Sequence, residues 1–231
     1  MNDKIFGFEK EKQLLKKIFE GSHGQSFILT GQEMIGKKTL VQTTAKATVI
    51  SDTDNVISID DIRRLKNVVS LKPFDGEWNA IIIDNAHLMT EEAQNALLKV
   101  LEEPNPSALL FLITSNPREL LPTILSRCQL IDCPSHTRRA YDELYESTDP
   151  PIGEAGLTPS QRDFLFQFTN GRIGLVKQII EEKRFSRIKS SIEELSKLAK
   201  QSTHERFKWA ETASEQTRPE MQNKILYWLL Y

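Results

Sequence analysis

The fold is decided by the stretch from Ser26 to Thr39, which reads SFILTGQEMIGKKT. Its first five residues are mostly apolar and predict a short buried strand. A glycine-bearing loop follows, and a helix is expected from there to about Lys46. A strand, a glycine loop and a helix in this order open a phosphate-binding unit, because free backbone N–H groups at the helix start can surround a phosphate.

The loop fits the pattern G-x4-G-K through Gly31, Gly36 and Lys37. The glycines let backbone N–H groups curl around phosphates, and the lysine reaches their outer oxygens. Lys38 stands where a serine or threonine would bind Mg²⁺, unless Thr39 takes that role one position later. We therefore predict a nucleotide-type fold, with a fortuitous glycine turn as the alternative. The loop alone leaves nucleotide binding undecided.

A second motif follows the apolar run Ala80–Ile83, a strand that ends in Asp84. This carboxylate is a candidate to hold Mg²⁺ through water. Hydrolysis normally needs another carboxylate beside it to orient or deprotonate the attacking water. That place is taken by Asn85, whose amide cannot act as a base, and His87 is either a substitute base or a structural residue. The pattern predicts a site that does not hydrolyse nucleotide.

Strands and helices alternate up to about residue 133. Besides the first strand, the expected strands are 79–84, 108–113 and a short one around 130–131. The expected helices between them include one from 61 to 71 with Asp60 as its N-cap, and one that Thr90 caps and Pro104 ends. Alternation of this kind predicts an α/β domain with a parallel sheet flanked by helices in three layers.

After Pro134 the pattern is helical only. We predict helices over 138–146, 159–168, 173–182, 188–200, 205–213 and 221–231. The last of these ends in an apolar stretch without a polar tail, which indicates an interface or a missing continuation. The expected division is an α/β domain over 1–134, a small helical domain over 135–185, and a further helical segment over 186–231 that is incomplete.

Composition excludes several classes of protein. The 231 residues suffice for a large core, and 27% charged with 39% hydrophobic residues excludes a disordered or low-complexity chain. A net charge of −2 argues against binding nucleic acid by bulk charge. Two cysteines suit a reducing cytoplasm and no disulfide framework, and the chain carries no apolar signal core or membrane-length run. We expect a cytoplasmic protein without a membrane segment and without a bound metal.

The segment Leu121–Cys128, which reads LPTILSRC, contains a third candidate feature. An arginine just after a short helix at the edge of such a domain can project toward a neighbour's triphosphate and stabilise charge in its transition state. The alternative for Arg127 is an ordinary surface salt bridge, and its spacing does not distinguish the two.

Three of these segments together resemble a known family: NALLKVLEEP over 95–104, FLITSNP over 111–117, and LPTILSRC over 121–128. They are similar to the bacterial clamp-loader subunits of DNA polymerase III, which are AAA+ proteins. The resemblance is specific from about 57 to 133 and weaker over the rest of the chain. It implies an AAA+ P-loop-type sheet, then a helical lid and part of an all-helical collar that holds subunits in a ring.

The resemblance also assigns roles to residues. It implies that Arg127 is an arginine finger acting in trans, and that Thr114 and Ser115 lie where the family senses the nucleotide phosphate. A further lid arginine of the family would fall at position 174, where this chain has Gly174. The nearby Arg172 is in another register and does not replace it. The family's cysteine-rich zinc module is also absent, since residues 40–80 contain no cysteine.

Lys38, Asn85 and Gly174 all depart from the family pattern in the same direction. An intact finger beside a degraded pocket resembles the delta-prime type of subunit, which does not hydrolyse ATP but completes a neighbour's site. The implied partners are the other clamp-loader subunits of a hetero-oligomer, the sliding clamp, and primed DNA through the complex. ATP is a possible ligand without hydrolysis. The expected nucleotide-site residues are Gly31, Gly36, Lys37, Lys38, Thr39, Asp84 and Thr114.

Two alternatives remain at this point. One is a gamma/tau-like motor subunit or another AAA+ ATPase, which would use Thr39 and an unrecognised base. The other is a structural adaptor that has lost the finger function as well.

Overall fold

The structure is a computed structural model that describes residues 5, 7–21, 25–52, 54–69, 79–147, 157–214 and 217–230. Pro73, Pro150, Pro151 and Tyr231, which bound predicted helices, lie outside the described residues. The chain divides into two compact units, Met1–Ala140 and Tyr141–Tyr231. The three-part division expected from the sequence stays a prediction.

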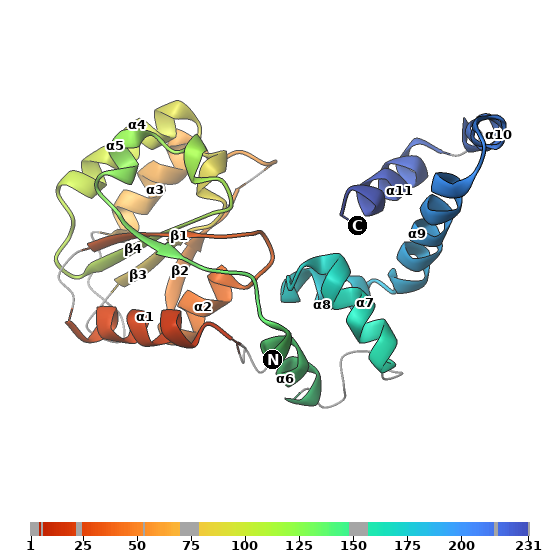
Figure 1. Cartoon of the computed structure of the whole chain (residues 1–231). Helices are drawn as coiled ribbons and strands as arrows, with labels where there is room; N and C mark the ends of the chain where they lie inside the picture. The colour runs from red at the N-terminus through yellow and green to blue at the C-terminus, as the bar shows by residue number, and fades with distance from the viewer. Residues whose placement is uncertain are drawn as a thin grey trace. The chain divides into compact units, whose positions relative to one another are not determined.

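The described residues of the first unit form a five-stranded parallel sheet in the order β2-β3-β4-β1-β5 (Figure 1). Its strands are β1 (Gln25–Thr30), β2 (Ala47–Ile50), β3 (Asn79–Ile83), β4 (Ala108–Thr114) and β5 (Gln129–Asp132). β4 is buried at every position, as a strand covered on both faces requires. The predicted parallel α/β class is therefore confirmed.

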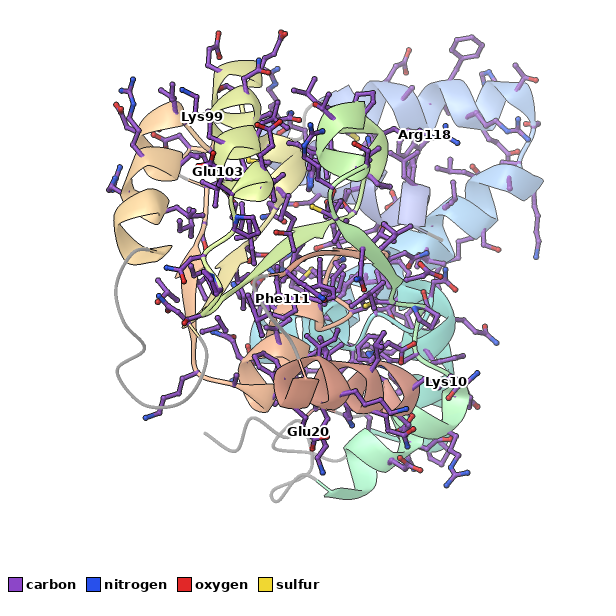
Figure 2. All side chains as sticks on the ribbon, turned by 90° about the vertical axis from the view of Figure 1, so that its left-hand side faces the viewer. Lys10, Glu20, Lys99, Glu103, Phe111 and Arg118 are labelled. Carbon is purple, nitrogen blue, oxygen red and sulfur yellow. The ribbon has the colours of Figure 1, made fainter. Side chains whose placement is uncertain are left out.

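Helices cover both faces of the sheet, as Figure 1 shows for α1 and α2 on one side and α3, α4 and α5 on the other. Their bounds are α1 (Glu9–Gly21), α2 (Lys37–Thr44), α3 (Ile59–Val69), α4 (Glu91–Glu102) and α5 (Pro122–Leu125), with short 3₁₀ turns η1 (Ala86–Leu88) and η2 (Pro117–Glu119). Each layer buries its own apolar cluster against the sheet. In Figure 2, Phe111 lies in the sheet while Lys10 and Lys99 mark the outer helices on opposite sides.

Two predicted helix boundaries in the first unit are corrected. Helix α3 begins at Ile59 and not at Asp61, because Ser58 rather than Asp60 caps it. The Ser58 N–H donates to an Asp61 carboxylate oxygen at 2.8 Å, and the Asp61 N–H returns a bond to the Ser58 hydroxyl at 3.4 Å. Helix α2 ends at Thr44, before the expected Lys46, because Ala45 has extended backbone angles. The predicted Thr90 cap of α4 is confirmed, with its hydroxyl accepting from the Ala93 N–H.

The second unit is helical in its described residues, as expected, but its last three helices begin at 185, 203 and 218 rather than at the predicted 188, 205 and 221. It contains most of α6 (Arg138–Ser147), then α7 (Pro159–Thr169), α8 (Ile173–Glu181), α9 (Phe185–Lys200), α10 (Thr203–Ser214) and α11 (Arg218–Leu230). Thr158 and Gln161 form a capping box at the start of α7. No helix in the described parts of the chain is long and apolar enough to cross a membrane.

Candidate functional site

The glycine loop leaves β1 between the ends of its neighbours β4 and β5. Thr30 lies opposite Thr114 on one side and Asp132 on the other, so the loop and the ends of these parallel strands share one edge of the sheet. In open parallel sheets, ligands bind outside this carboxyl edge. The edge is therefore the candidate nucleotide site.

Gly31 and Gly36 meet different requirements in the loop. Gly31 has φ +145°, and a Cβ there would lie 2.2 Å from the backbone oxygen of Cys133, so no side chain fits. Gly36 has φ +99°, but the nearest atom to its Cβ position is 3.7 Å away. Gly31 is thus required by close packing as well as by its backbone conformation, whereas Gly36 is required by conformation alone.

Lys37 is buried and folds back onto the loop. Its ammonium donates to the carbonyl oxygens of Gly31 at 2.7 Å and Gln32 at 2.6 Å. Burial lowers the pKa of Lys37, and the nearby Cys133, Glu33 and Asp84 oppose that shift. The ammonium group of the predicted phosphate-binding lysine, the first residue of α2, therefore lies against the loop, where its bonds hold the loop's shape.

Lys38 and Asp84 form an ion pair across the site. The Lys38 ammonium lies 2.8 Å from an Asp84 carboxylate oxygen, and the two residues come from the first turn of α2 and the end of β3. Of the two candidates in that turn, Lys38 makes this bond, and Thr39 is half-buried beside it. The structure thus brings Lys38 and Asp84 together at the place where the fold family implies a metal.

The residues present do not fit Mg²⁺. Magnesium needs oxygen ligands in near-octahedral geometry, and it uses the hydroxyl and carboxylate that a P-loop site normally offers. Here the hydroxyl is replaced by an ammonium group, which has N–H donors and no lone pair to give a metal. A dication beside that ammonium would also meet like charge.

The side chains next to Asp84 are held by polar neighbours. Asn85 has φ +52°, and its amide donates to Asp52 at 3.0 Å. His87 Nδ1 lies 3.2 Å from the hydroxyl of Thr114. That hydroxyl is buried and also accepts from the Asn116 N–H at 3.0 Å. The predicted phosphate sensor thus holds the turn after β4, and His87 packs against it.

Arg127 follows α5 and makes surface bonds. Its guanidinium donates to Glu102 at 2.8 Å, where it forms an ion pair, and to the Thr123 carbonyl at 3.0 Å. The side chain of Arg127 is 36% exposed and that of Glu102 is 51% exposed. Exposed pairs of this kind contribute about 0–1 kcal/mol, so this one can be exchanged for a stronger partner.

Two buried polar residues were missed from the sequence. Gln94, beside the apolar stripe of α4, donates to the carbonyls of Met89 and Glu119 and accepts from the Leu121 N–H at 2.7 Å. His136, after β5, lies 2.6 Å from the Ile35 carbonyl of the glycine loop, and an acceptor oxygen there requires the ring nitrogen to carry the proton. A polar residue within an apolar stripe was the available signal for Gln94; a lone histidine offered none.

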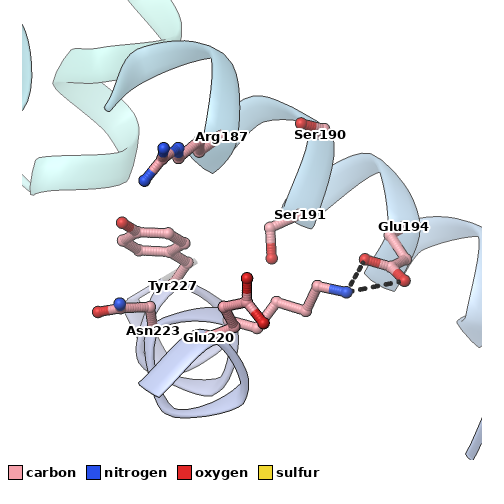
Figure 3. A pocket seen from close by; sticks show the side chains of 8 residues that line it. Arg187, Ser190, Ser191, Glu194, Glu220, Asn223 and Tyr227 are labelled. Carbon is pink, nitrogen blue, oxygen red and sulfur yellow. Dashed lines mark hydrogen bonds and ion pairs between the residues drawn. The ribbon is translucent and has the colours of Figure 1, made fainter. Parts of the chain in front are cut away.

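The second unit has a hollow of its own between α9 and α11, with a volume of about 570 Å³ (Figure 3). Lys224 and Glu194 form an ion pair in its wall at 2.8 Å. Glu194 also accepts from the indole N–H of Trp209 at 2.7 Å, and Trp228 donates to the Ser191 carbonyl. These bonds join three helices, which gives the wall a structural role.

The fold and the site together define a class of protein. A glycine loop between β1 and α2 of a five-stranded parallel sheet, followed by a helical unit, is a P-loop module of the AAA+ type. A gamma-subunit-related protein of DNA polymerase III from Thermotoga maritima has the same fold, with a TM-score of 0.57 and 26% sequence identity. The similarity covers 82% of this chain and 65% of that one.

The sequence comparisons narrow the class. Residues 44–137 match the family described as DNA polymerase III, delta subunit. The delta-prime subunit of Buchnera aphidicola is 38% identical over 87 residues, 38% of this chain and 26% of that protein. The tau subunit of Bacillus subtilis is 38% identical over 82 residues, 36% of this chain and 15% of that protein. The matched part therefore spans about a quarter of the delta-prime relative, and less of tau.

Over this matched part the chain is similar to clamp-loader subunits of the AAA+ type, delta-prime subunits among them, and the predicted resemblance is confirmed.

Proposed function

We propose that this protein is a non-hydrolysing, delta-prime-like subunit of the replicative clamp loader, which supplies Arg127 to the ATP of a neighbouring subunit. Its partners are then the other clamp-loader subunits, the sliding clamp, and primed DNA held by the complex in the cytoplasm. In this proposal, residues 1–134 form the AAA+ domain, 135–185 the lid, and 186–231 part of the collar.

The observation that carries the non-hydrolysing role is the Lys38–Asp84 ion pair. It engages the carboxylate that would otherwise help to hold a metal. The adjacent Asn85 donates its amide to Asp52 and offers no carboxylate to activate water. His87 faces Thr114, which supports a structural role for it rather than that of a base.

The position of Arg127 supports the finger role. The residue lies just after a helix of four residues, with its guanidinium at the surface. Its link to Glu102 is weak enough to be given up for a triphosphate, which offers higher charge and bidentate oxygens. An arginine that donates in trans needs this combination of fixed backbone and exchangeable side-chain partner.

The test is Arg127→Ala in the reconstituted loader. We expect the variant to fold and assemble while the DNA-stimulated ATPase falls sharply, because losing a finger costs roughly 10³-fold or more at the site that it serves. Arg118→Ala is the matched control, since Arg118 is an exposed arginine on the nearby η2 turn. An Arg127→Ala complex with an unchanged rate would refute the finger role.

A second candidate, a gamma/tau-like motor subunit, is favoured by the similarity to tau and to the gamma-related structure. It requires that this chain turn over ATP alone or as a homo-oligomer, with activity abolished by Lys37→Ala. Measuring phosphate release by the isolated chain decides between the two. Turnover that depends on Lys37 would replace the non-hydrolysing proposal.

A further inference from the structure

We propose that the Lys38 ammonium takes the place of the divalent cation in the glycine-loop site, so that the site binds a nucleoside triphosphate free of metal. The inference deepens the proposed function and rests on its non-hydrolysing site. Lys38 becomes the residue that determines which form of the ligand is bound, the free polyphosphate or its magnesium complex.

Geometry supports the substitution. A P-loop site holds its metal between two protein side chains, one directly after the loop lysine and one at the end of a neighbouring strand. In this chain those two positions are occupied by Lys38 and by Asp84, at the end of β3. Their side chains meet at 2.8 Å, although 46 positions separate them in the sequence. The ammonium thus bonds the same carboxylate that would otherwise face the metal.

The ammonium also keeps capacity for a phosphate. An ammonium group has three N–H donors, and among the described residues Asp84 takes one from Lys38. Gly31 and Gln32 take two from Lys37, which leaves a third. The Lys38 side chain is 43% exposed, so its remaining donors are open to a ligand. Lys38 can therefore bond Asp84 and a phosphate oxygen together, as a bridging metal would.

Charge gives the site its preference. Lys37 and Lys38 bring two positive charges to the start of α2, of which the Asp84 carboxylate balances one, and the helix dipole there also favours an anion. A free triphosphate offers its full negative charge to both lysines. Its magnesium complex has less negative charge and brings a dication next to the Lys38 ammonium.

The experiment is equilibrium binding of ATP to the full chain by titration calorimetry, once with EDTA and once with excess MgCl₂. We expect wild-type protein to bind in EDTA and to gain nothing from magnesium. Lys38→Thr restores the hydroxyl at this position, so we expect magnesium to strengthen its binding by roughly tenfold. Lys10→Thr, an exposed lysine on α1, is the control that should behave as wild type.

Two results would overturn the inference: wild-type protein that binds only with magnesium, or wild-type protein that binds ATP under neither condition. Both are read from wild type alone, so they do not depend on the folding of Lys38→Thr. Neither result bears on Arg127, because the binding is measured in the isolated chain. Failure here is thus distinguishable from failure of the finger proposal.

Discussion

In the glycine loop, the space available for a single Cβ atom decides which residue types fit. The absent Cβ of Gly31 makes room for the Cys133 backbone oxygen, so that β5 can exit directly over the start of the loop. The motif pattern treats Gly31 and Gly36 alike, but their surroundings differ. Close packing at Gly31 means that this glycine is needed for folding, whether or not a phosphate binds.

Gly31→Ala should therefore destabilise the protein by more than about 3 kcal/mol, because its methyl group meets a backbone atom that cannot move aside alone. The measurement is urea unfolding followed by circular dichroism. Gly21→Ala is the control, since a Cβ there meets nothing within 4 Å, and it should stay within about 1 kcal/mol of wild type. Equal stabilities for the two variants would contradict the packing argument.

Among the elements, α4 connects the core to the segment that carries Arg127. Its buried apolar residues Ala93, Leu97 and Leu101 pack in one core cluster with Ile124 of α5. Gln94 adds polar bonds to Glu119 and Leu121, just before α5 begins. Helix α5 is only four residues long, so these contacts, rather than its own hydrogen bonds, hold it in place.

Gln94→Leu should cost about 2–4 kcal/mol, because it leaves the partly buried Leu121 N–H and two carbonyl oxygens without their partner. Asn95→Leu, at the exposed neighbouring position on α4, is the control and should change stability by less than about 0.5 kcal/mol. Equilibrium unfolding in denaturant gives both values. A Gln94→Leu protein as stable as wild type would show that α5 is positioned without this side chain.

Over the whole first unit, His136 joins segments that are distant in the chain. It bonds the Ile35 carbonyl 101 positions away and packs edge-on against Phe8 at 4.4 Å between ring centroids. Burial lowers the pKa of His136 below its usual 6.5, opposed by the Ile35 bond and by Glu9 and Glu11, with Lys12 acting in the same direction as burial. The folded protein therefore holds this histidine neutral.

Stability should consequently fall as the pH drops below 6.5. The unfolded chain then takes up a proton at His136 that the folded protein resists until its lower pKa is reached, so unfolding is favoured in that window. Unfolding free energies between pH 7.5 and 5.5 measure the slope. His136→Gln should flatten it, whereas His204→Gln, at an exposed position on α10, should leave the wild-type slope. An unaltered slope in His136→Gln would assign the pH dependence to other groups.

Much of the fold and most residues of the candidate site were predictable from the sequence, because both depend on patterns of neighbouring residues. A continuous apolar run such as Ile81–Ile83 indicates a buried strand, and glycine spacing locates the loop between strand and helix. The first and last residues of the helices were harder to predict than the helices themselves. Ser58 and Asp60 are both good caps two positions apart, and the hydrogen bonds to Asp61 decide between them.

Sequence could name Lys38, Asp84 and Arg127, but it could not say what each one contacts. Lys38 and Asp84 meet only because parallel strands bring their carboxyl ends to one edge, and Glu102 reaches Arg127 only because α4 and α5 pack on one face. Local preferences act over a few residues, whereas these ion pairs join residues 46 and 25 positions apart. Folding of the whole unit therefore decides which charges are neutralised, and with them the chemistry of the site.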